Sequence, residues 1–396
     1  MDKRYFFKVL PFFLMLQKIE CWKRVINDHS LLSKIQESTL SNVATMAKLR
    51  KQWTVDEITV AAELVAAREK AKGKLDNAIT LASDSSGVQQ ATSSAIARHK
   101  AKRFMGHSNI VDLCCGIGSD LCALPDNAIG VDLDSLRCWM AEENTNKTVH
   151  CCDATTFELT DDCVIHVDPA RRNSAGRIFE LEEMIPKFSE VVTIAKKTSG
   201  GCIKLSPAVN PEDIKQLPPF EIEYIEEKNR LVQAALWYGS LTQKDGKTTA
   251  TSIKLGESFS GMIEPTTFSK KINKWILEPN VALERASLHG TLGNEFNASE
   301  LAPGIGLLTT NENPKSPWFT SFELLATTSL RLEKVVAVLR DLKCTQVEVK
   351  TRGKTVDPNQ WQKKLNKKAS GPLLTIFALR LGKKHVALIA RRFVSQ

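Results

Sequence analysis

Residues 110–134 read IVDLCCGIGSDLCALPDNAIGVDLD and contain two short apolar runs, each of which ends in an acid. The first run ends at Asp112 and the second at Asp132, with a Gly-x-Gly turn, Gly116 to Gly118, between them. Short apolar runs bounded by turn residues are typical of buried strands. The separation of 20 residues between the two acids suits two neighbouring parallel strands and their crossover. This stretch therefore predicts the start of a parallel α/β sheet.

The same alternation of apolar runs and helical segments continues to about residue 206. The expected strands are NIVDL (109–113), AIGVD (128–132), KTVHC (147–151), CVIHVD (163–168) and CIKLS (202–206). We expect helices at 135–145 and 179–188 between them. Strands that are apolar on both faces indicate a parallel, doubly wound sheet. Two more runs, at 221–227 and 231–239, are only three residues apart. This closeness allows only an antiparallel hairpin, which we place at the sheet edge.

The regions on either side of this sheet have different patterns. An amphipathic helix is expected at 55–75, capped by Asp56, and a second helical stretch at 88–104. Near the C-terminus the pattern predicts helices at 330–342 and 357–368 and strands at 345–353, 372–382 and 384–393. We therefore expect a helical region at 1–105, the α/β domain at 106–245, connecting strands and loops at 246–320, and a small α+β domain at 321–396.

The net charge of +9 is concentrated at the C-terminal end of the chain. Residues 341–396 contain 13 Lys or Arg and 3 Asp or Glu, so the other 340 residues sum to −1. A basic module on a nearly neutral body favours a polyanionic partner, most plausibly nucleic acid. A solvated basic surface without a partner is the alternative.

Neither the cysteines nor the N-terminal apolar run predicts a secreted or membrane protein. The 10 cysteines include two vicinal pairs in strand-like runs, and their spacings fit no zinc site. We expect a reduced, cytoplasmic protein without a metal. The run from Tyr5 to Leu16 is interrupted by Lys8 and Pro11 and is too short to span a bilayer. We expect it to be an apolar helix packed on the rest of the protein rather than a signal peptide.

Polar residues gather at the ends of the expected strands, where open parallel sheets bind ligands. They are Asp112, Gly116, Gly118, Asp132, Asp153 and Asp168. A dinucleotide loop needs a third glycine, and Ser119-Asp120-Leu121 follows here instead. Asp120, expected at the start of a helix, would also repel a phosphate. The phosphate loop Gly-x(4)-Gly-Lys-Ser/Thr is absent from the sequence as well. A ligand with an ammonium, a carboxylate, a ribose and an adenine fits these ends better than a diphosphate.

The segment Asp112-Leu-Cys-Cys-Gly-Ile-Gly118 resembles the first motif of class I S-adenosylmethionine-dependent methyltransferases. The resemblance implies a Rossmann-like sheet that binds S-adenosylmethionine. It implies that the glycine loop contacts the methionine part, that Asp132 binds the ribose hydroxyls and that Asp153 accepts from the adenine amino group. The cofactor-binding residues expected in this way are Asp112, Cys114, Gly116, Gly118, Asp132 and Asp153.

The fourth strand ends in HVDPARRNSAGR, residues 166–177. Amino-methylating members of the superfamily have an Asp/Asn/Ser-Pro-Pro-aromatic motif at this point. This chain retains Asp168-Pro169 but has no aromatic ring, which argues against amine methylation of a base. Asp168 is predicted to accept a hydrogen bond from the nucleophile, with Pro169 fixing the loop. Arg171 and Arg172 are predicted to bind a substrate phosphate or carboxylate, or else to pair with nearby acids.

Three motifs make the family resemblance more specific. They are DPARR, SPWFTSFELL (316–325) and VKTRGKTVDPNQWQKKL (349–365). These motifs resemble a family of bacterial-type class I methyltransferases that have a THUMP-like C-terminal domain and are distantly similar to RNA cap trimethylguanosine synthases. The resemblance covers residue 55 to the C-terminus and includes an acid-proline element at 278–280. THUMP domains bind RNA, which agrees with the basic tail.

The tail supplies the expected phosphate contacts, chief among them Lys350, Arg352 and Lys354. Trp361 is expected to pack in the core rather than to stack on a base. His166 is also expected to be packed, because strand alternation turns it toward the core.

The sequence thus predicts an S-adenosylmethionine-dependent methyltransferase that acts on RNA. Methyl transfer is an in-line attack on a sulfonium methyl group and needs neither a metal nor a catalytic triad. One alternative is an RNA-binding protein whose methyltransferase fold is catalytically inactive. The other is a nicotinamide-dependent oxidoreductase. The target atom, the RNA class and the oligomeric state are left open by the sequence.

Overall fold

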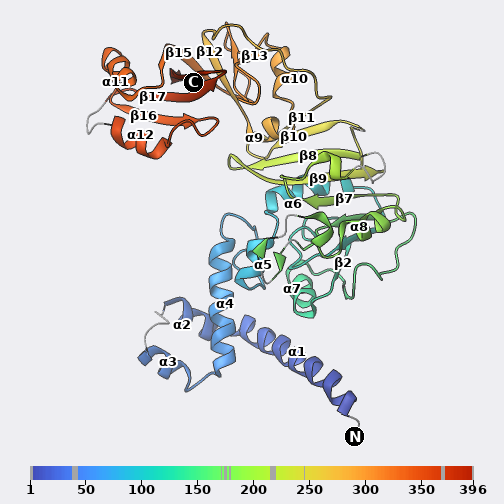
Figure 1. Cartoon of the computed structure of the whole chain (residues 1–396). Coiled ribbons are helices and arrows are strands. Elements are labelled where there is room, and N and C mark those ends of the chain that lie inside the picture. The colour runs from blue at the N-terminus through green and yellow to red at the C-terminus, as the bar shows by residue number, and fades with distance from the viewer. Residues whose placement is uncertain are drawn as a thin grey trace. The chain divides into compact units, whose positions relative to one another are not determined.

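The computed structural model describes residues 3–37, 43–170, 172–173, 176–177, 180–214, 220–244, 246–366 and 371–394. The side chains of residues 3–14, 43–44, 172–173 and 176–177 lie outside this description. The chain divides into two compact units (Figure 1). The first contains residues 1–220 and 234–245, and the second contains residues 221–233 and 246–396.

A mixed sheet with the strand order β9-β7-β4-β1-β2-β3 forms the centre of the first unit. Its strands are β1 (Ile110–Leu113), β2 (Ile129–Asp132), β3 (Val149–Cys151), β4 (Val164–Val167), β7 (Gly200–Leu205) and β9 (Arg230–Gly239). Neighbouring strands are parallel except for β9, which runs antiparallel to β7. The predicted parallel α/β sheet is confirmed. The strand order reverses at β1, which has β2 on one side and β4 on the other, so a ligand site is expected there.

The helices beside this sheet agree only in part with the sequence prediction. Helix α7 (Ser135–Thr145) has the predicted bounds, and Asp134 caps it by accepting from the backbone N–H of Leu136. The helix predicted at 179–188 is wrong. Pro186 interrupts that stretch, which has a single 3-10 turn, and α8 (Phe188–Ala195) begins only after it. Two short strands, β5 (Arg172–Asn173) and β6 (Gly176–Arg177), pair with each other after β4.

The connection from β1 to β2 consists of turns, without the helix that the sequence predicts. Asp120, expected at the N-terminus of that helix, is buried instead. Its carboxylate forms an ion pair with Lys100 in the interior of the unit, and it does not begin a helix.

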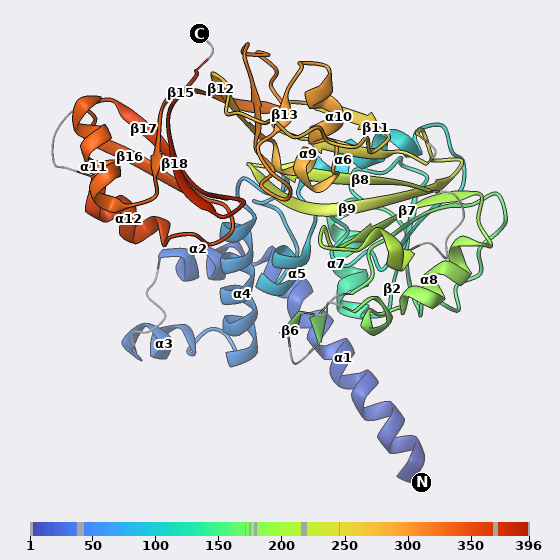
Figure 2. The same ribbon diagram turned by 45° about the horizontal axis from the view of Figure 1, so that its top comes forward.

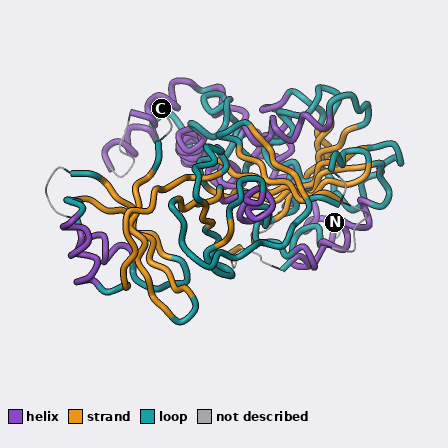
Figure 3. The backbone as a smooth tube through the Cα atoms, turned by 90° about the horizontal axis from the view of Figure 1, so that it is seen from above, coloured by secondary structure: helices purple, strands orange, loops and turns teal. Residues whose placement is uncertain are grey.

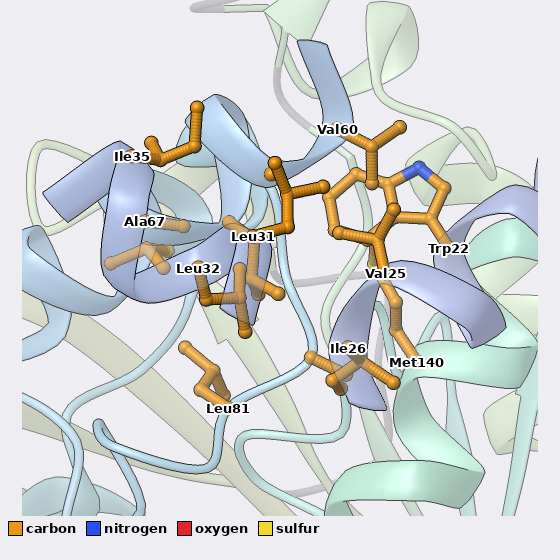
Figure 4. Close-up of a cluster of buried hydrophobic side chains, with 14 of the residues drawn as sticks. Trp22, Val25, Ile26, Leu31, Leu32, Ile35, Val60, Ala67, Leu81 and Met140 are labelled. Carbon is orange, nitrogen blue, oxygen red and sulfur yellow. The ribbon is translucent and has the colours of Figure 1, made fainter. Parts of the chain in front are cut away.

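In the described part of the chain, six α-helices precede the sheet. They are α1 (Lys3–Asn27), α2 (His29–Glu37), α3 (Val43–Leu49), α4 (Val55–Ala71), α5 (Ser85–Gln90) and α6 (Ser94–Ala101). Helices α1, α2 and α4 pack on one another (Figure 2). Their shared core includes Trp22 and Leu31 and extends to Met140 of α7, so the helices and the sheet domain are held together by apolar contacts (Figure 4).

Two details of these helices differ from the prediction. Thr54, rather than Asp56, caps α4, and its side chain and that of Glu57 form a reciprocal capping box. The helical stretch predicted at 88–104 is interrupted at residues 91–93, between α5 and α6. At this break Thr92 and Ser93 are buried, and the backbone N–H of Thr92 donates to the side chain of Ser119 instead of to a helical carbonyl.

The N-terminal apolar run belongs to α1. The side chains up to residue 14 lie outside the described part of the chain, so the packing predicted for the run rests on Met15 and Leu16, both of which are exposed. Buried contacts of α1 begin at Cys21 and Trp22. Within the described residues, no helix has the length and apolar character needed to cross a bilayer.

The second unit begins with β8 (Phe220–Glu227), β10 (Thr248–Ser252) and β11 (Glu257–Gly261). Two residues in left-handed backbone conformation, Lys228 and Asn229, join β8 to β9. The predicted change of direction is therefore present. The predicted edge position is wrong, because β10 pairs in parallel with β8.

A seven-stranded sheet with the order β13-β14-β12-β15-β18-β17-β16 forms the remainder of this unit. Its strands are β12 (Trp275–Pro279), β13 (Ser299–Glu300), β14 (Leu308–Thr310), β15 (Phe319–Ser329), β16 (Gln346–Thr351), β17 (Leu373–Leu381) and β18 (Lys384–Arg392), and its helices are α9 (Val281–Arg285), α10 (His289–Asn294), α11 (Leu332–Asp341) and α12 (Pro358–Leu365). Helices α11 and α12 cover one face of the sheet, where Val335 and Leu365 pack against Ile376 (Figure 3). The opposite face has its own apolar cluster around Phe322 and Phe377.

Candidate functional site

A cavity of about 450 Å³ lies in the first unit at the carboxyl ends of β1, β2 and β4. The loop after β1 (114–117 and 119), Asp132 and Asp134 after β2, and residues 168–170 after β4 line it. Residues of α5 and of the break that follows it, 87 and 89–91, line it as well. The cavity thus lies where the reversal of strand order predicts a ligand site.

The glycines of the loop have two different functions in the structure. Gly116 has a φ of 58° and no atom within 4 Å of the place where a Cβ would be, so the loop leaves open space at the cavity. Gly118 has a φ of 80°, and a Cβ there would lie 2.8 Å from Cγ2 of Thr145 on α7. Gly118 is therefore needed for close packing of the loop on α7, while Gly116 lines the cavity. Cys114, also with positive φ, lines it too.

Asp132 is held in a fixed orientation at the cavity wall. Its Oδ2 accepts from the backbone N–H of Gly116 at 2.8 Å, and its Oδ1 accepts from that of Asp134 at 3.0 Å. Burial raises the pKa of this carboxyl above its ordinary value, although the two N–H donors act in the opposite direction. Each oxygen retains a lone pair that can accept from a ligand hydroxyl.

Asp168 lies at the opposite side of the cavity and forms an ion pair with Lys204 of β7. The distance between Nζ of Lys204 and Oδ2 of Asp168 is 2.5 Å. Lys204 is buried, whereas Asp168 is partly exposed and lines the cavity, as do Pro169 and Ala170. The buried lysine thus fixes one oxygen of the carboxylate, and the other oxygen is available to a ligand.

The ion pair of Asp168 continues into a buried polar network. Nζ of Lys204 also donates to Oγ1 of Thr92 at 2.8 Å, and that hydroxyl donates to Oδ2 of Asp120 at 2.6 Å. Asp120 pairs with Lys100 of α6, whose Nζ lies 2.8 Å from Oδ1. Nζ of Lys100 lies 2.8 Å from Nε2 of His166, and Nδ1 of His166 lies 2.6 Å from Oδ1 of Asp112. We call these seven side chains the buried relay.

The donors and acceptors of the buried relay determine the tautomer of His166. The ammonium of Lys100 has only donors, so Nε2 of His166 accepts and its proton is on Nδ1, which donates to Asp112. Burial alone would lower the pKa of Lys100, but Asp120 raises it above its ordinary value, so the lysine is charged. The same ion pair outweighs burial at Asp120 and lowers the pKa of that carboxyl far below its usual range.

Two of the predicted cofactor contacts lie elsewhere. The side chain of Asp112 is 1% exposed, is bonded to His166 and does not line the cavity. Asp112 therefore supports the loop from inside instead of facing a common cleft with Asp132. Asp153 is exposed, and its Oδ1 accepts from the backbone N–H and the hydroxyl of Thr155 outside the cavity lining. His166 is packed as predicted, but within a polar network.

The two arginines of DPARR cannot be placed at the site. Arg171 and the side chain of Arg172 lie outside the described part of the chain. Their predicted role as substrate contacts stays a prediction.

The predicted phosphate contacts of the tail lie in the second unit, at the end of β16. Nζ of Lys350 is 2.5 Å from Oε2 of Glu278, and Arg352 approaches Glu278 at 3.8 Å and Glu284 at 3.4 Å. Lys354 is exposed in the turn that follows β16. Trp361 is half-buried against the core beneath α12, as predicted.

Sequence reasoning missed Thr92, Lys100 and Lys204. A signal for Lys204 was present, because CIKLS places one lysine in an otherwise apolar buried strand. Lys100 and Thr92 left no such signal, since a lysine on a helix and a threonine in a Ser/Thr-rich turn are ordinary surface residues. Among the residues that the structure describes, no group of three His, Cys, Asp or Glu side chains is placed to hold a metal ion.

Comparison with known proteins finds a family match for the C-terminal segment and curated relatives for most of the chain. Residues 319–392 match the family of THUMP domain-like sequences. Two curated relatives, from Mycobacterium tuberculosis strains CDC 1551/Oshkosh and ATCC 25618/H37Rv, are each named an uncharacterized S-adenosylmethionine-dependent methyltransferase. Each is 30% identical over 304 residues, which covers 74% of this chain and 83% of the relative.

A solved structure shows the same fold. The crystal structure of a proposed methyltransferase from Porphyromonas gingivalis W83 matches with a TM-score of 0.73 at 18% identity. The match covers 96% of this chain and 98% of the other. The fold of nearly the whole chain, including residues 246–320 and the C-terminal sheet, therefore occurs in another protein.

Proposed function

We propose that this chain, which belongs to the S-adenosylmethionine-dependent methyltransferases, transfers the cofactor's methyl group to RNA. The observation that carries the proposal is the cavity at the carboxyl ends of β1, β2 and β4, with Asp132 on one side and Asp168 on the other. Family membership indicates that the cofactor is S-adenosylmethionine. The THUMP domain-like segment and the basic tail favour RNA as the substrate.

The residues at this cavity fit S-adenosylmethionine. Asp132 has two fixed oxygens for the ribose hydroxyls, and its position at the end of β2 is the one that the family resemblance implies. The open space at Gly116 lets the methionine part approach the backbone of the loop. When bound, the cofactor supplies an electrophilic methyl group on a sulfonium sulfur. A diphosphate would fit less well, because three carboxylates, those of Asp132, Asp134 and Asp168, line the cavity against one cation among the described residues, Arg137, which already pairs with Asp84.

We assign to Asp168 the role of accepting a hydrogen bond from the substrate's nucleophile. The ion pair of Asp168 with Lys204 fixes the direction of the carboxylate. A hydroxyl or amine of the substrate that donates to Asp168 would be held in orientation for in-line attack, and the carboxylate of Asp168 would accept the proton that this nucleophile gives up. Pro169 restricts the backbone next to this carboxylate. The absence of an aromatic residue after Pro169 makes a stacked base amine the less favoured acceptor.

The decisive experiment is transfer of tritiated methyl from S-adenosylmethionine to total tRNA and rRNA, with protein extract as the control substrate. We expect label in an RNA fraction with the natural chain and none with Asp132→Ala. Label in protein alone would contradict the RNA assignment. RNA binding together with cofactor binding but no transfer would support a catalytically inactive RNA-binding protein instead.

A further inference from the structure

We infer that a cavity in the second unit binds a nucleotide of single-stranded RNA, with three cations at its rim for phosphate and an exposed aromatic ring for a base. The inference rests on the proposed function, because it names the part of the basic unit that holds the RNA. The cavity has a volume of about 790 Å³, and all of its lining residues belong to the second unit. This volume lies within the range of ligand-binding pockets, roughly 300–1,000 Å³.

The interior of this cavity contains four half-buried charges. Lys350 and Arg352 come from the end of β16, Glu278 from β12 and Glu284 from α9. Their side chains are between 18% and 32% exposed. Charges that are partly removed from water lose hydration, and ion pairing restores only part of this free energy. Such a cluster contributes little to stability, and its charges lie where a polar ligand in the cavity can reach them.

The three ion pairs of the cluster differ in length. Lys350 and Glu278 are in close contact, whereas both guanidinium contacts of Arg352 with Glu284 are long, at 3.4 and 3.5 Å. A guanidinium has five N–H donors, and long contacts leave it free to turn toward a better acceptor. A phosphate oxygen is such an acceptor, and it binds guanidinium in a bidentate manner.

The rim of the cavity adds positive charge that is not neutralised. Lys254, Lys315 and Arg392 line the cavity and are exposed. Within the described part of the chain, none of the three has a carboxylate at ion-pair distance. Because the interior pairs cancel each other, these three cations give the cavity an excess charge of about +3 that attracts polyanions.

An aromatic ring lies next to one of these cations. Phe393 follows Arg392 at the end of β18, lines the cavity and is 40% exposed. Its ring packs edge-on against Trp275, with 5.8 Å between the ring centroids, and its backbone N–H donates to Ser321. These contacts fix the ring while one part remains open to solvent. An exposed aromatic ring among cations is the arrangement by which proteins hold unpaired bases and their phosphates.

The test measures binding of a short fluorescein-labelled single-stranded RNA to the full chain over a range of salt concentrations. One variant removes the rim charge, Lys254→Gln/Lys315→Gln/Arg392→Gln, and a second removes the ring, Phe393→Ala. The matched control, Lys363→Gln/Lys364→Gln/Lys384→Gln, removes equal charge from exposed positions of the same unit that do not line the cavity. Thermal unfolding of each variant verifies that it folds.

We expect the rim variant to lower the salt slope by about 2, since each single-strand phosphate contact contributes roughly 0.7. Phe393→Ala is expected to weaken binding about tenfold with an unchanged slope, because it removes stacking and no charge. The matched control keeps the affinity of the natural chain within about threefold. An affinity lost in the control but kept in the rim variant would place the RNA at α12 or the start of β18 and overturn the inference, leaving the proposed function intact.

Two other outcomes separate this inference from the proposed function. If the natural chain binds no RNA while it still transfers methyl groups to another substrate, the RNA assignment fails and the inference fails with it. If polyglutamate displaces the RNA and binds with equal affinity to the natural chain and to Phe393→Ala, the cavity is a site for acidic polypeptide, which also overturns the inference.

Discussion

Asp132 determines how cofactor binding should depend on pH. In the proposed site the ionised carboxylate accepts from the ribose hydroxyls, and burial raises its pKa above the ordinary value. The protonated form loses an acceptor, so the affinity for S-adenosylmethionine falls as the pH decreases through this raised pKa. We expect the fall to begin at a higher pH than an exposed aspartate would give. Asp132→Asn should bind on the order of 100-fold more weakly and show no such pH dependence, as measured by calorimetry. A pH dependence retained in this variant would assign the titration to another group.

Lys204 acts through Asp168, and its removal should affect the reaction more than cofactor binding. In Lys204→Met the carboxylate loses the cation that fixes its direction. We therefore expect kcat to fall by roughly 100-fold while the KM for S-adenosylmethionine changes little. Lys204→Arg should restore part of the rate. If Lys204→Met raised that KM and left kcat unchanged, Lys204 would belong to the cofactor site instead.

The residues at the cavity were predictable where the signal lay in the backbone. Gly116 and Asp132 follow buried strands at a fixed spacing, so their location needs only the strand pattern. Asp112 has the same type of position, yet its side chain points inward to His166. That difference depends on His166 of β4 and Lys100 of α6. His166 is 54 residues from Asp112 in the chain, and Lys100 is 66 residues from His166. No local pattern encodes such contacts.

Helix α6 is attached to the sheet by a charged contact rather than by apolar packing alone. Lys100 is 1% exposed and donates to both Asp120 and His166. Removing one partner of a buried ion pair leaves an uncompensated charge, which costs about 3–5 kcal/mol. We expect Lys100→Met to lower the free energy of unfolding by this amount in urea titrations. Lys102→Met, an exposed position just past the end of the same helix, should change it by less than about 0.5 kcal/mol. Equal effects of the two variants would mean that the buried relay does not stabilise the fold.

The elements themselves were predictable to different degrees. Strands β1, β2, β4 and β7 are short, mostly apolar and largely buried runs, and a run of this kind has few alternatives. The break between α5 and α6 was not predictable, because residues 88–104 satisfy the helical pattern throughout. Tertiary contacts decide it: the hydroxyl of Thr92 bonds to Asp120, and its backbone N–H donates to Ser119. The same bonds bring the break to the cavity.

The C-terminal basic segment is an integral part of the second unit, because it shares a sheet and an apolar cluster with the residues before it. The charge asymmetry of the chain suggested a separable tail, but β15 is an inner strand of its sheet, with β12 on one side and β18 on the other. Ile276 and Leu307, which precede the tail, share an apolar cluster with Phe322 and Phe377, which belong to it. The family match to residues 319–392 therefore marks a sequence segment whose sheet continues beyond it.

Truncation after Pro317 tests this point. The truncated chain loses four strands of the seven-stranded sheet and exposes the cluster around Ile276, so we expect residues 246–317 to be cleaved rapidly in limited proteolysis and the protein to bind ANS. Adding the separate segment 318–396 should restore protection, because it returns the missing strands. A truncated chain that resisted proteolysis would show that residues 246–317 fold without the tail. A loss of RNA binding on truncation locates the RNA site in the tail only if residues 246–317 fold without the tail. Point variants that keep the sheet intact test the RNA site without this condition.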